Sequence, residues 1–121
     1  LNVQVVKNYL KDRYNVGYTL NGKEGINLLE TEKPDVILLD IMMPMLSGHE
    51  VTEIIRRKYN KIELPIVMMT ARNNSEDIVE AFKKGVNDYV VKPVVREELA
   101  ARIEHILKMK ETIDNFGKKD K

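Results

Sequence analysis

The chain has 121 residues, enough for one domain with a substantial hydrophobic core. Its formal net charge of +1 gives no reason to expect nucleic acid, a membrane surface or an acidic substrate as a partner. It contains no cysteine, which excludes disulfides, thiolate catalysis and cysteine-based metal sites. There is no apolar run long enough to cross a bilayer and no secretory signal, so we expect a cytoplasmic location.

Hydrophobic periodicity and turn residues predict helices that alternate with strands along the chain. The predicted helices cover residues 1–14, 23–33, 48–60, 75–85 and 96–116. The predicted strands cover residues 15–20, 35–40, 64–70 and 88–92. Several strands are continuous apolar runs, the pattern of strands buried on both faces. The sequence therefore predicts an α/β fold with a doubly wound parallel sheet.

Three polar residues stand where three of these strands end. The strand 35–40 ends in Asp40, the strand 64–70 ends in Thr70, and the strand 88–92 ends in Lys92. Ligands of such sheets bind just outside the carboxyl ends of the strands. A carboxylate, a hydroxyl and an ammonium group gathered there suit phosphoryl transfer to Asp40. Asp40 would be the nucleophile, while Lys92 and the Thr70 hydroxyl would hold the phosphoryl oxygens.

The sequence resembles the receiver (REC) domain of a two-component response regulator. Five stretches carry the resemblance, in the family's order and over nearly the whole chain: "LNGKEG", "DVILLDIMMPMLSG", "PIVMMTA", "GVNDYVVKP" and "EEL". The resemblance implies a flavodoxin-like sheet with strand order 2-1-3-4-5. It also implies that the strand 35–40 is the family's third strand.

The resemblance also implies roles for individual residues. Asp40 matches the phosphoacceptor, Thr70 the switch hydroxyl, and Lys92 the lysine that binds the phosphoryl group. Ala71 matches the small residue that leaves room for that group. Tyr89 matches the aromatic residue that swings inward on activation, although the residue pattern alone fits equally well a strand tyrosine with an exposed hydroxyl.

The family binds Mg²⁺ beside its phosphoacceptor. Asp40 would contribute its carboxylate and Met42 its backbone carbonyl, while Pro44 and Gly48 match the loop after the phosphoacceptor. The family's acidic pair, which completes the metal site, precedes the first helix and has no counterpart in this chain. We therefore expect these 121 residues to bind magnesium weakly, if at all, and to accept phosphate poorly.

The function that the resemblance implies is that of a signalling domain. Asp40 would take a phosphoryl group from a sensor histidine kinase or a phosphotransfer protein. The face formed by the family's fourth helix, fifth strand and fifth helix would then control an output domain or a partner. We expect no enzymatic activity beyond self-catalysed phosphoryl transfer and autodephosphorylation. We expect no direct binding to nucleic acid and no membrane association, and a homodimer is compatible with the long last helix.

The domain boundaries follow from the same comparison. Residues 1–109 correspond to a receiver domain that starts within its first helix, and residues 110–121 to a helix extension and basic tail that would lead to an output domain. The family's central first strand is not among these residues. Its loss would remove several buried side chains worth about 1.5–3 kcal/mol each. We therefore expect residues before Leu1 in the natural protein. The alternatives are a strand lent by a second copy and a rearranged sheet.

The same residues are also compared with three other classes of protein. A pseudo-receiver that binds proteins without taking phosphate remains open, because the acidic pair is not seen. A haloacid-dehalogenase-type phosphatase would need a second aspartate at position 42, where this chain has methionine. A flavodoxin would need a phosphate-binding loop after its first strand. The two histidines, His49 and His105, are interpreted as surface residues.

Overall fold

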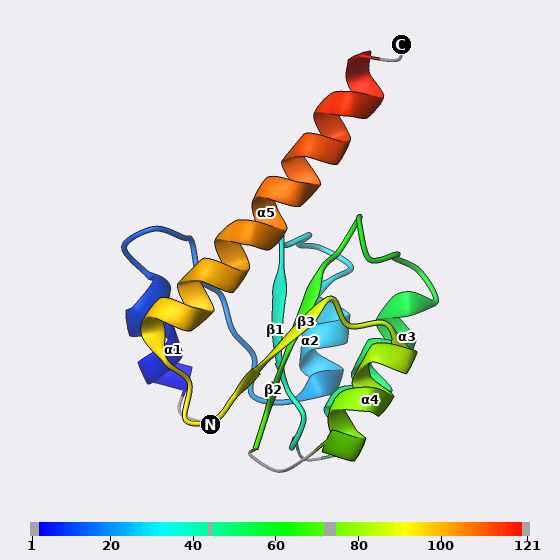
Figure 1. Ribbon diagram of the computed structural model, residues 1–121. Helices are drawn as coiled ribbons and strands as arrows, with labels where there is room; N and C mark the ends of the chain where they lie inside the picture. The colour runs from blue at the N-terminus through cyan, green and yellow to red at the C-terminus, as the bar shows by residue number, and fades with distance from the viewer. Residues whose placement is uncertain (1–2, 44, 72–74, 120–121) are drawn as a thin grey trace.

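The computed structural model describes residues 3–43, 45–71 and 75–119. The described residues form five helices and three strands, which alternate from α2 onward, whereas α1 is followed directly by α2 (Figure 1). The helices are α1 (Val3–Leu10), α2 (Gly22–Leu28), α3 (Gly48–Arg56), α4 (Ser75–Lys84) and α5 (Arg96–Lys119). The strands are β1 (Ile37–Asp40), β2 (Ile66–Thr70) and β3 (Asp88–Val91).

The three strands form one parallel sheet in the order β1-β2-β3. In the register of the central strand, Met69 lies opposite Asp40 on one side and opposite Val90 on the other. Parallel strands joined by helical crossovers point the same way, so all three carboxyl ends lie at one edge of the sheet. The strands β1, β2 and β3 correspond to the third, fourth and fifth strands of the expected 2-1-3-4-5 order.

Helices cover both faces of the sheet, as the doubly wound prediction requires. In Figure 1, α1 and α5 lie on one side of the strands and α2, α3 and α4 on the other. Side chains of β2 alternate between the two resulting cores because successive residues of a strand point to opposite faces. Ile66 and Met68 join the core under α3 and α4, while Val67 and Met69 join the core under α1 and α5.

The strand predicted for residues 15–20 is wrong. This segment has no regular secondary structure, and Asn21 instead begins α2 by accepting a hydrogen bond from the backbone N–H of Glu24. Val16 packs against the core under α1 and α5, whereas Leu20 is 69% exposed. A strand is stabilised by its ladder partner, and the order 2-1-3-4-5 would pair this segment with the family's first strand alone. The described residues supply no such partner.

The strand β1 is less buried than its apolar sequence predicted. Leu39 is buried, but Ile37 and Leu38 are only half-buried, whereas all five residues of β2 are buried. The reason is the position of the strand: β1 is an edge of the described sheet, and β2 is its centre. An apolar run indicates burial but does not distinguish a central strand from one whose second neighbour is absent.

The last helix continues past the predicted domain boundary without a break. Helix α5 runs from Arg96 to Lys119 and projects beyond the rest of the molecule (Figure 1). Its buried residues lie in the first half, and Met109, Ile113 and Phe116 are exposed. The division at residues 109 and 110 stays a prediction, and residues 120–121 of the predicted tail lie outside the described part.

Membrane association can be judged for the described residues only. Among them, no helix is both long and apolar enough to span a bilayer. The cytoplasmic location expected from the sequence stays a prediction.

At the end of the sheet opposite to the strand carboxyl ends, one arginine connects several elements by hydrogen bonds. The guanidinium of Arg56, at the end of α3, donates hydrogen bonds to the carbonyl of Gly85 at 2.7 Å and to the carbonyl of Leu64 at 2.8 Å. It also donates to the side-chain oxygen of Asn87, which in turn accepts from the backbone N–H of Ile66. Burial lowers the pKa of Arg56. This side chain therefore joins α3, the end of α4 and the beginnings of two strands.

Replacing Arg56 with leucine should lower the free energy of unfolding by about 2–4 kcal/mol, because hydrogen bonds to a charged group are worth roughly 1.5–3 kcal/mol each and the carbonyls would lose their donors. Urea denaturation followed by circular dichroism measures this change. Arg57→Leu is the matched control, since its side chain is 72% exposed with one ion pair to Glu53. It should cost at most about 0.5 kcal/mol. Equal effects of the two variants would contradict the role of Arg56.

Candidate functional site

The candidate site lies at the carboxyl edge of the sheet, where the ladder continues past the strand ends. The backbone N–H of Ile41, directly after Asp40, donates to the carbonyl of Met69 at 3.0 Å. The backbone N–H of Lys92 donates to the carbonyl of Thr70 at 2.7 Å. These two bonds fix the backbone on both sides of β2. Asp40, Thr70 and Lys92 consequently stand side by side at one edge, as their positions at the strand ends predicted.

The carboxylate of Asp40 accepts hydrogen bonds from a side chain and from the backbone. The Nζ of Lys92 lies 2.7 Å from Oδ1 of Asp40, and the backbone N–H of Met42 donates to the same oxygen at 3.0 Å. Both charged side chains are mostly buried, with 13% of Asp40 and 24% of Lys92 exposed. Partial burial strengthens the attraction between the charges compared with that of a fully exposed pair. The ion pair joins the ends of β1 and β3 at the edge of the sheet. The peptide bond from Lys92 to Pro93 is cis.

The other two residues of the predicted phosphate site lie beside this pair. Thr70 is 1% exposed, and its hydroxyl donates to the carbonyl of Ala71 at 3.5 Å. A hydrogen bond of that length is weak, so the hydroxyl can exchange it for a better acceptor at small cost. Ala71 itself is exposed at the end of β2. The roles of Thr70 and Ala71 in phosphate binding stay predictions.

Tyr89 lies in β3, half-buried between two helices. Its ring makes an edge-to-face contact with Phe82 of α4, with centroids 5.9 Å apart and an angle of 84° between the ring planes. The guanidinium of Arg102 in α5 lies 5.9 Å from the ring centroid and donates to both carboxylate oxygens of Asp88. That bond to Asp88 raises the pKa of Arg102. Tyr89 therefore connects β3 with both α4 and α5.

The loop after Asp40 is closed by Gly48. The backbone N–H of Gly48 donates to the carbonyl of Ile41 at 3.0 Å, and a Cβ atom at this position would lie 2.8 Å from the carbonyl oxygen of Asp40. The approach of α3 to the end of β1 therefore requires a residue without a side chain. Within the loop, Met42 is 77% exposed and Met45 has a positive φ of 72°. Pro44, which the resemblance placed in this loop, lies outside the described residues.

The start of α3 is fixed by its own sequence. The Ser47 hydroxyl accepts from the backbone N–H of Glu50, and the Glu50 carboxylate accepts from the backbone N–H of Ser47. This reciprocal capping box satisfies two donors that a helix start would otherwise leave unpaired. It sets the point at which the loop from Asp40 ends.

The described residues do not supply a complete magnesium site at this edge. Magnesium prefers six oxygen ligands in octahedral geometry, commonly from one or two carboxylates, waters and a substrate phosphate. Over residues 3–43, 45–71 and 75–119, no group of three metal-ligating side chains includes Asp40. Asp40 and the carbonyl of Met42 are the donors that the resemblance assigns. The sequence-based expectation that these residues bind magnesium weakly stays a prediction.

The interpretation of His49 as a surface residue was wrong. His105 is exposed as expected, but the side chain of His49 is only 13% exposed and is covered by α4. Its position after Gly48, at a polar helix start, suggested the surface. The sequence did not predict this burial, because the carboxylates near His49 lie on α4 and not on its own helix α3.

Comparisons with known proteins show what this chain is similar to. A family model described as the response regulator receiver domain matches residues 1–104. The transcriptional regulatory protein AfsQ1 of Streptomyces coelicolor is 42% identical over 95 residues. That match covers 78% of this chain and 41% of AfsQ1, so the chain corresponds to less than half of that relative.

Solved structures give the same result. The receiver domain of a Francisella response regulator is 31% identical, with a TM-score of 0.79 over 88% of this chain and 87% of the other. The receiver domain of NtrX from Brucella abortus, 22% identical, has a TM-score of 0.80 over 87% of this chain and 88% of its own and shares the fold.

Replacing Gly48 with alanine should destabilise the protein by about 1–3 kcal/mol, because the added methyl group must displace backbone atoms of Asp40 and Ile41. Urea denaturation gives the free energy, and amide NMR shifts should report movement of residues 40–42. Gly17→Ala is the matched control, since nothing lies within 4 Å of a Cβ atom there. Unchanged stability and unchanged shifts near Asp40 in the Gly48 variant would show that the close approach is unimportant.

Proposed function

This chain belongs to the receiver domains of response regulators, and from that membership we propose that Asp40 is the phosphoacceptor of a two-component phosphorelay. The observation that supports the proposal most strongly is the contact of 2.7 Å between Lys92 and Asp40. It places a cation beside the only carboxylate among the strand-end residues Asp40, Thr70 and Val91. A phosphoryl group on Asp40 would carry charge to which that cation is complementary.

The chemical step would be an in-line displacement at phosphorus. A carboxylate oxygen of Asp40 attacks the phosphorus of a phosphohistidine, a P–O bond forms, and the P–N bond breaks. The bonding electrons leave with the imidazole of the donor protein, which takes a proton from water. Lys92 would then pair with the phosphoryl oxygens, and Ala71 would leave space for them. The Thr70 hydroxyl would exchange its 3.5 Å bond to the Ala71 carbonyl for a charged oxygen.

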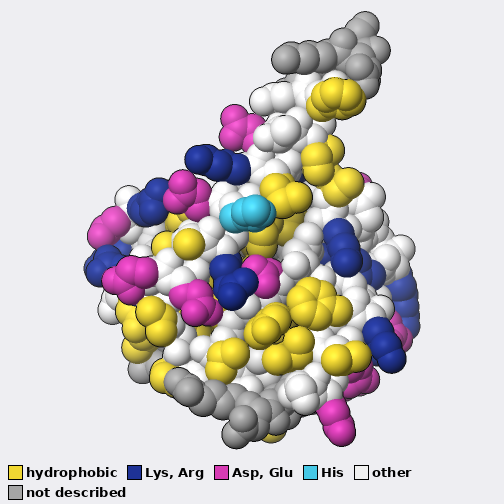
Figure 2. Space-filling model, in the orientation of Figure 1, with side chains coloured by type: hydrophobic (Ala, Val, Ile, Leu, Met, Phe, Trp, Pro, Cys, Tyr) yellow, Lys and Arg dark blue, Asp and Glu magenta, His cyan; other side chains and the backbone are white. Residues whose placement is uncertain are grey.

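The added charge would be read out through Tyr89 and the helices on either side of it. A phosphoryl group adds about −1.5 to −2 charges at neutral pH. Drawing the Thr70 hydroxyl towards it would leave room for Tyr89 to repack, at the cost of its edge-to-face contact with Phe82. We propose that the face made by α4, β3 and α5 is the output surface. Figure 2 shows a group of exposed hydrophobic side chains on one face of the molecule. On α4, the hydrophobic residues Val79 and Phe82 are exposed.

The proposed partners follow from the family. A sensor histidine kinase or a phosphotransfer protein would supply the phosphoryl group, and an output domain or separate protein would bind the switched face. The relative AfsQ1 is a transcriptional regulatory protein, and most of its length lies outside the matched part. By analogy, the extension of α5 would lead towards such an output domain. The chain would catalyse its own phosphorylation and dephosphorylation and no reaction on other substrates.

A second candidate is a pseudo-receiver that binds proteins without taking phosphate. The observation that favours it is the metal donor set, because Asp40 belongs to no group of three metal-ligating side chains among the described residues. In that case, the ion pair between Asp40 and Lys92 would be a permanent structural contact. Phosphorylation by a small-molecule donor distinguishes the two candidates without a cognate kinase.

Incubation with acetyl phosphate and magnesium should phosphorylate the full-length natural protein. The variant Asp40→Asn of that protein should lose the label completely, because the amide cannot form an acyl phosphate. Intact-mass spectrometry measures the added phosphoryl group. Asp35→Asn is the matched control: Asp35 is exposed, lies at the opposite end of the same predicted strand and should leave labelling unchanged. Lys92→Ala should lower the labelling rate at least about tenfold, as expected for a charge stabiliser of the transition state.

The outcomes separate the candidates. A label that persists in Asp40→Asn would refute the phosphoacceptor assignment. Absence of label in the unaltered protein, with a folded circular dichroism spectrum, would favour the pseudo-receiver.

A further inference from the structure

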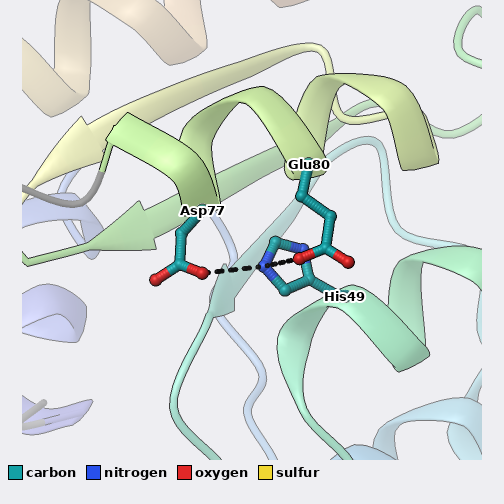
Figure 3. Close-up of side chains that lie close together, drawn as sticks. All are labelled: His49, Asp77 and Glu80. Carbon is teal, nitrogen blue, oxygen red and sulfur yellow. Dashed lines mark ion pairs between the residues drawn. The ribbon is translucent and has the colours of Figure 1, made fainter.

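A second group of chemically reactive side chains lies between α3 and α4. It consists of His49 near the start of α3 and of Asp77 and Glu80 on α4. Asp77 and Glu80 are three residues apart, so both project from the same face of their helix. Figure 3 shows the two carboxylates converging on the imidazole ring from α4. Asp40 is not a member of this group.

The imidazole of His49 finds no hydrogen-bond partner among residues 3–43, 45–71 and 75–119. Both ring nitrogens are inaccessible to solvent, and neither makes a hydrogen bond to a described residue. The Nε2 atom lies 3.6 Å from a carboxylate oxygen of Asp77 and 3.4 Å from one of Glu80, which is too long for a good hydrogen bond. A buried polar group left without a hydrogen bond destabilises the fold. A bound cation at Nε2 would remove that cost.

The spacing of these atoms matches the ligand shell of a tetrahedral transition-metal ion. Bonds of about 2.0–2.2 Å from zinc to nitrogen and oxygen place neighbouring ligand atoms about 3.3–3.6 Å apart at tetrahedral angles. The two measured separations, 3.4 and 3.6 Å, fall within that range, and all three ligand atoms lie within 4.8 Å of one another. The nitrogen–oxygen separations thus equal those of two ligand atoms that bind the same ion.

The donor chemistry selects the class of metal. Imidazole nitrogen suits zinc and other transition metals, whereas magnesium strongly prefers oxygen. Two carboxylates balance the charge of a divalent ion. Because the carboxylates of Asp77 and Glu80 are 36% and 52% exposed, the site is open to water on that side, and water would complete the coordination. We propose that His49, Asp77 and Glu80 bind a divalent transition-metal ion of the zinc class, distinct from the magnesium expected at Asp40.

Such an ion would join α3 to α4. Helix α3 begins where the loop from Asp40 ends, and α4 carries Phe82, the contact of Tyr89. The metal would therefore stabilise the unswitched arrangement of α4 against α3. Metal binding itself rests only on the three ligands and does not require that Asp40 accept phosphate.

Titration of the metal-free protein, purified without a histidine tag, tests the proposal. Isothermal titration calorimetry with Zn²⁺ should show one site that disappears or weakens at least about tenfold in His49→Gln, since even outer-shell partners of a metal are worth roughly 10–100-fold in affinity. Mg²⁺ should not compete for this site. His105→Gln is the matched control, because His105 is exposed and belongs to no metal-ligating group among the described residues.

Two further variants keep the test decisive if His49→Gln fails to fold. Asp77→Asn combined with Glu80→Gln alters partly exposed side chains and should remove the same site, whereas the neighbouring Glu76→Gln should retain it. Nitrogen NMR of the imidazole should show that zinc perturbs Nε2 of His49.

Three results would overturn the proposal: no zinc binding by the unaltered protein, binding unchanged by the variants of His49 and of the two carboxylates, or binding lost only in Asp40→Asn. The last result would place zinc at the phosphoacceptor. Failure of acetyl phosphate labelling would leave the proposed zinc site standing.

Discussion

The in-register parallel pairing of β1, β2 and β3 is the constraint on which the candidate site depends. Asp40 and Lys92 lie far apart in the sequence, and they meet because each stands at the end of a strand that pairs with β2. The backbone hydrogen bonds from Ile41 to Met69 and from Lys92 to Thr70 extend the ladder to the residues of the candidate site. A shift of one residue in either pairing would turn one of the two charged side chains to the other face. The contact between the Lys92 ammonium and the Asp40 carboxylate thus depends on the backbone register.

Two structural devices hold that edge in place. On the site side, Gly48 lets α3 approach the end of β1, and the capping box of Ser47 and Glu50 fixes where the helix begins. At the opposite end, Arg56 on the same helix binds the carbonyls of Gly85 and Leu64. Helix α3 is therefore held at both of its ends. The loop after Asp40 runs from the end of β1 to the fixed start of this helix. A reactive carboxylate needs this kind of support, since catalytic geometry is set by surrounding packing.

Much of this arrangement could be predicted from the sequence, for identifiable reasons. Helix and strand alternation follows from periodicity, and a parallel sheet brings strand ends together, which is why Asp40, Thr70 and Lys92 could be grouped before the structure was known. The strand at residues 15–20 was predicted from its residue pattern alone. The prediction was wrong because a strand requires a ladder partner, and the resemblance places that partner, the family's first strand, outside these residues. The half-buried edge strand β1 differs from its prediction for the same reason.

Contacts between helices were also beyond the reach of sequence patterns. The position of His49 against Asp77 and Glu80 depends on how α3 and α4 pack across one face of the sheet, which no spacing within either helix encodes. Several partners of Arg56 come from the end of α4, the start of β3 and the loop before β2, and these contacts are visible only in three dimensions. The residues at the carboxyl edge of the sheet could be predicted because strand direction places them there. The contacts between helices could not be predicted, because they depend on side-chain packing.

The central claim is that the carboxylate of Asp40 forms the acyl phosphate, and chemical trapping tests it most directly. Borohydride reduces an aspartyl phosphate to homoserine and leaves free carboxylates unchanged. After phosphorylation and reduction, peptide mass mapping should find homoserine at position 40 alone. Homoserine at another aspartate, with position 40 unmodified, would contradict the account.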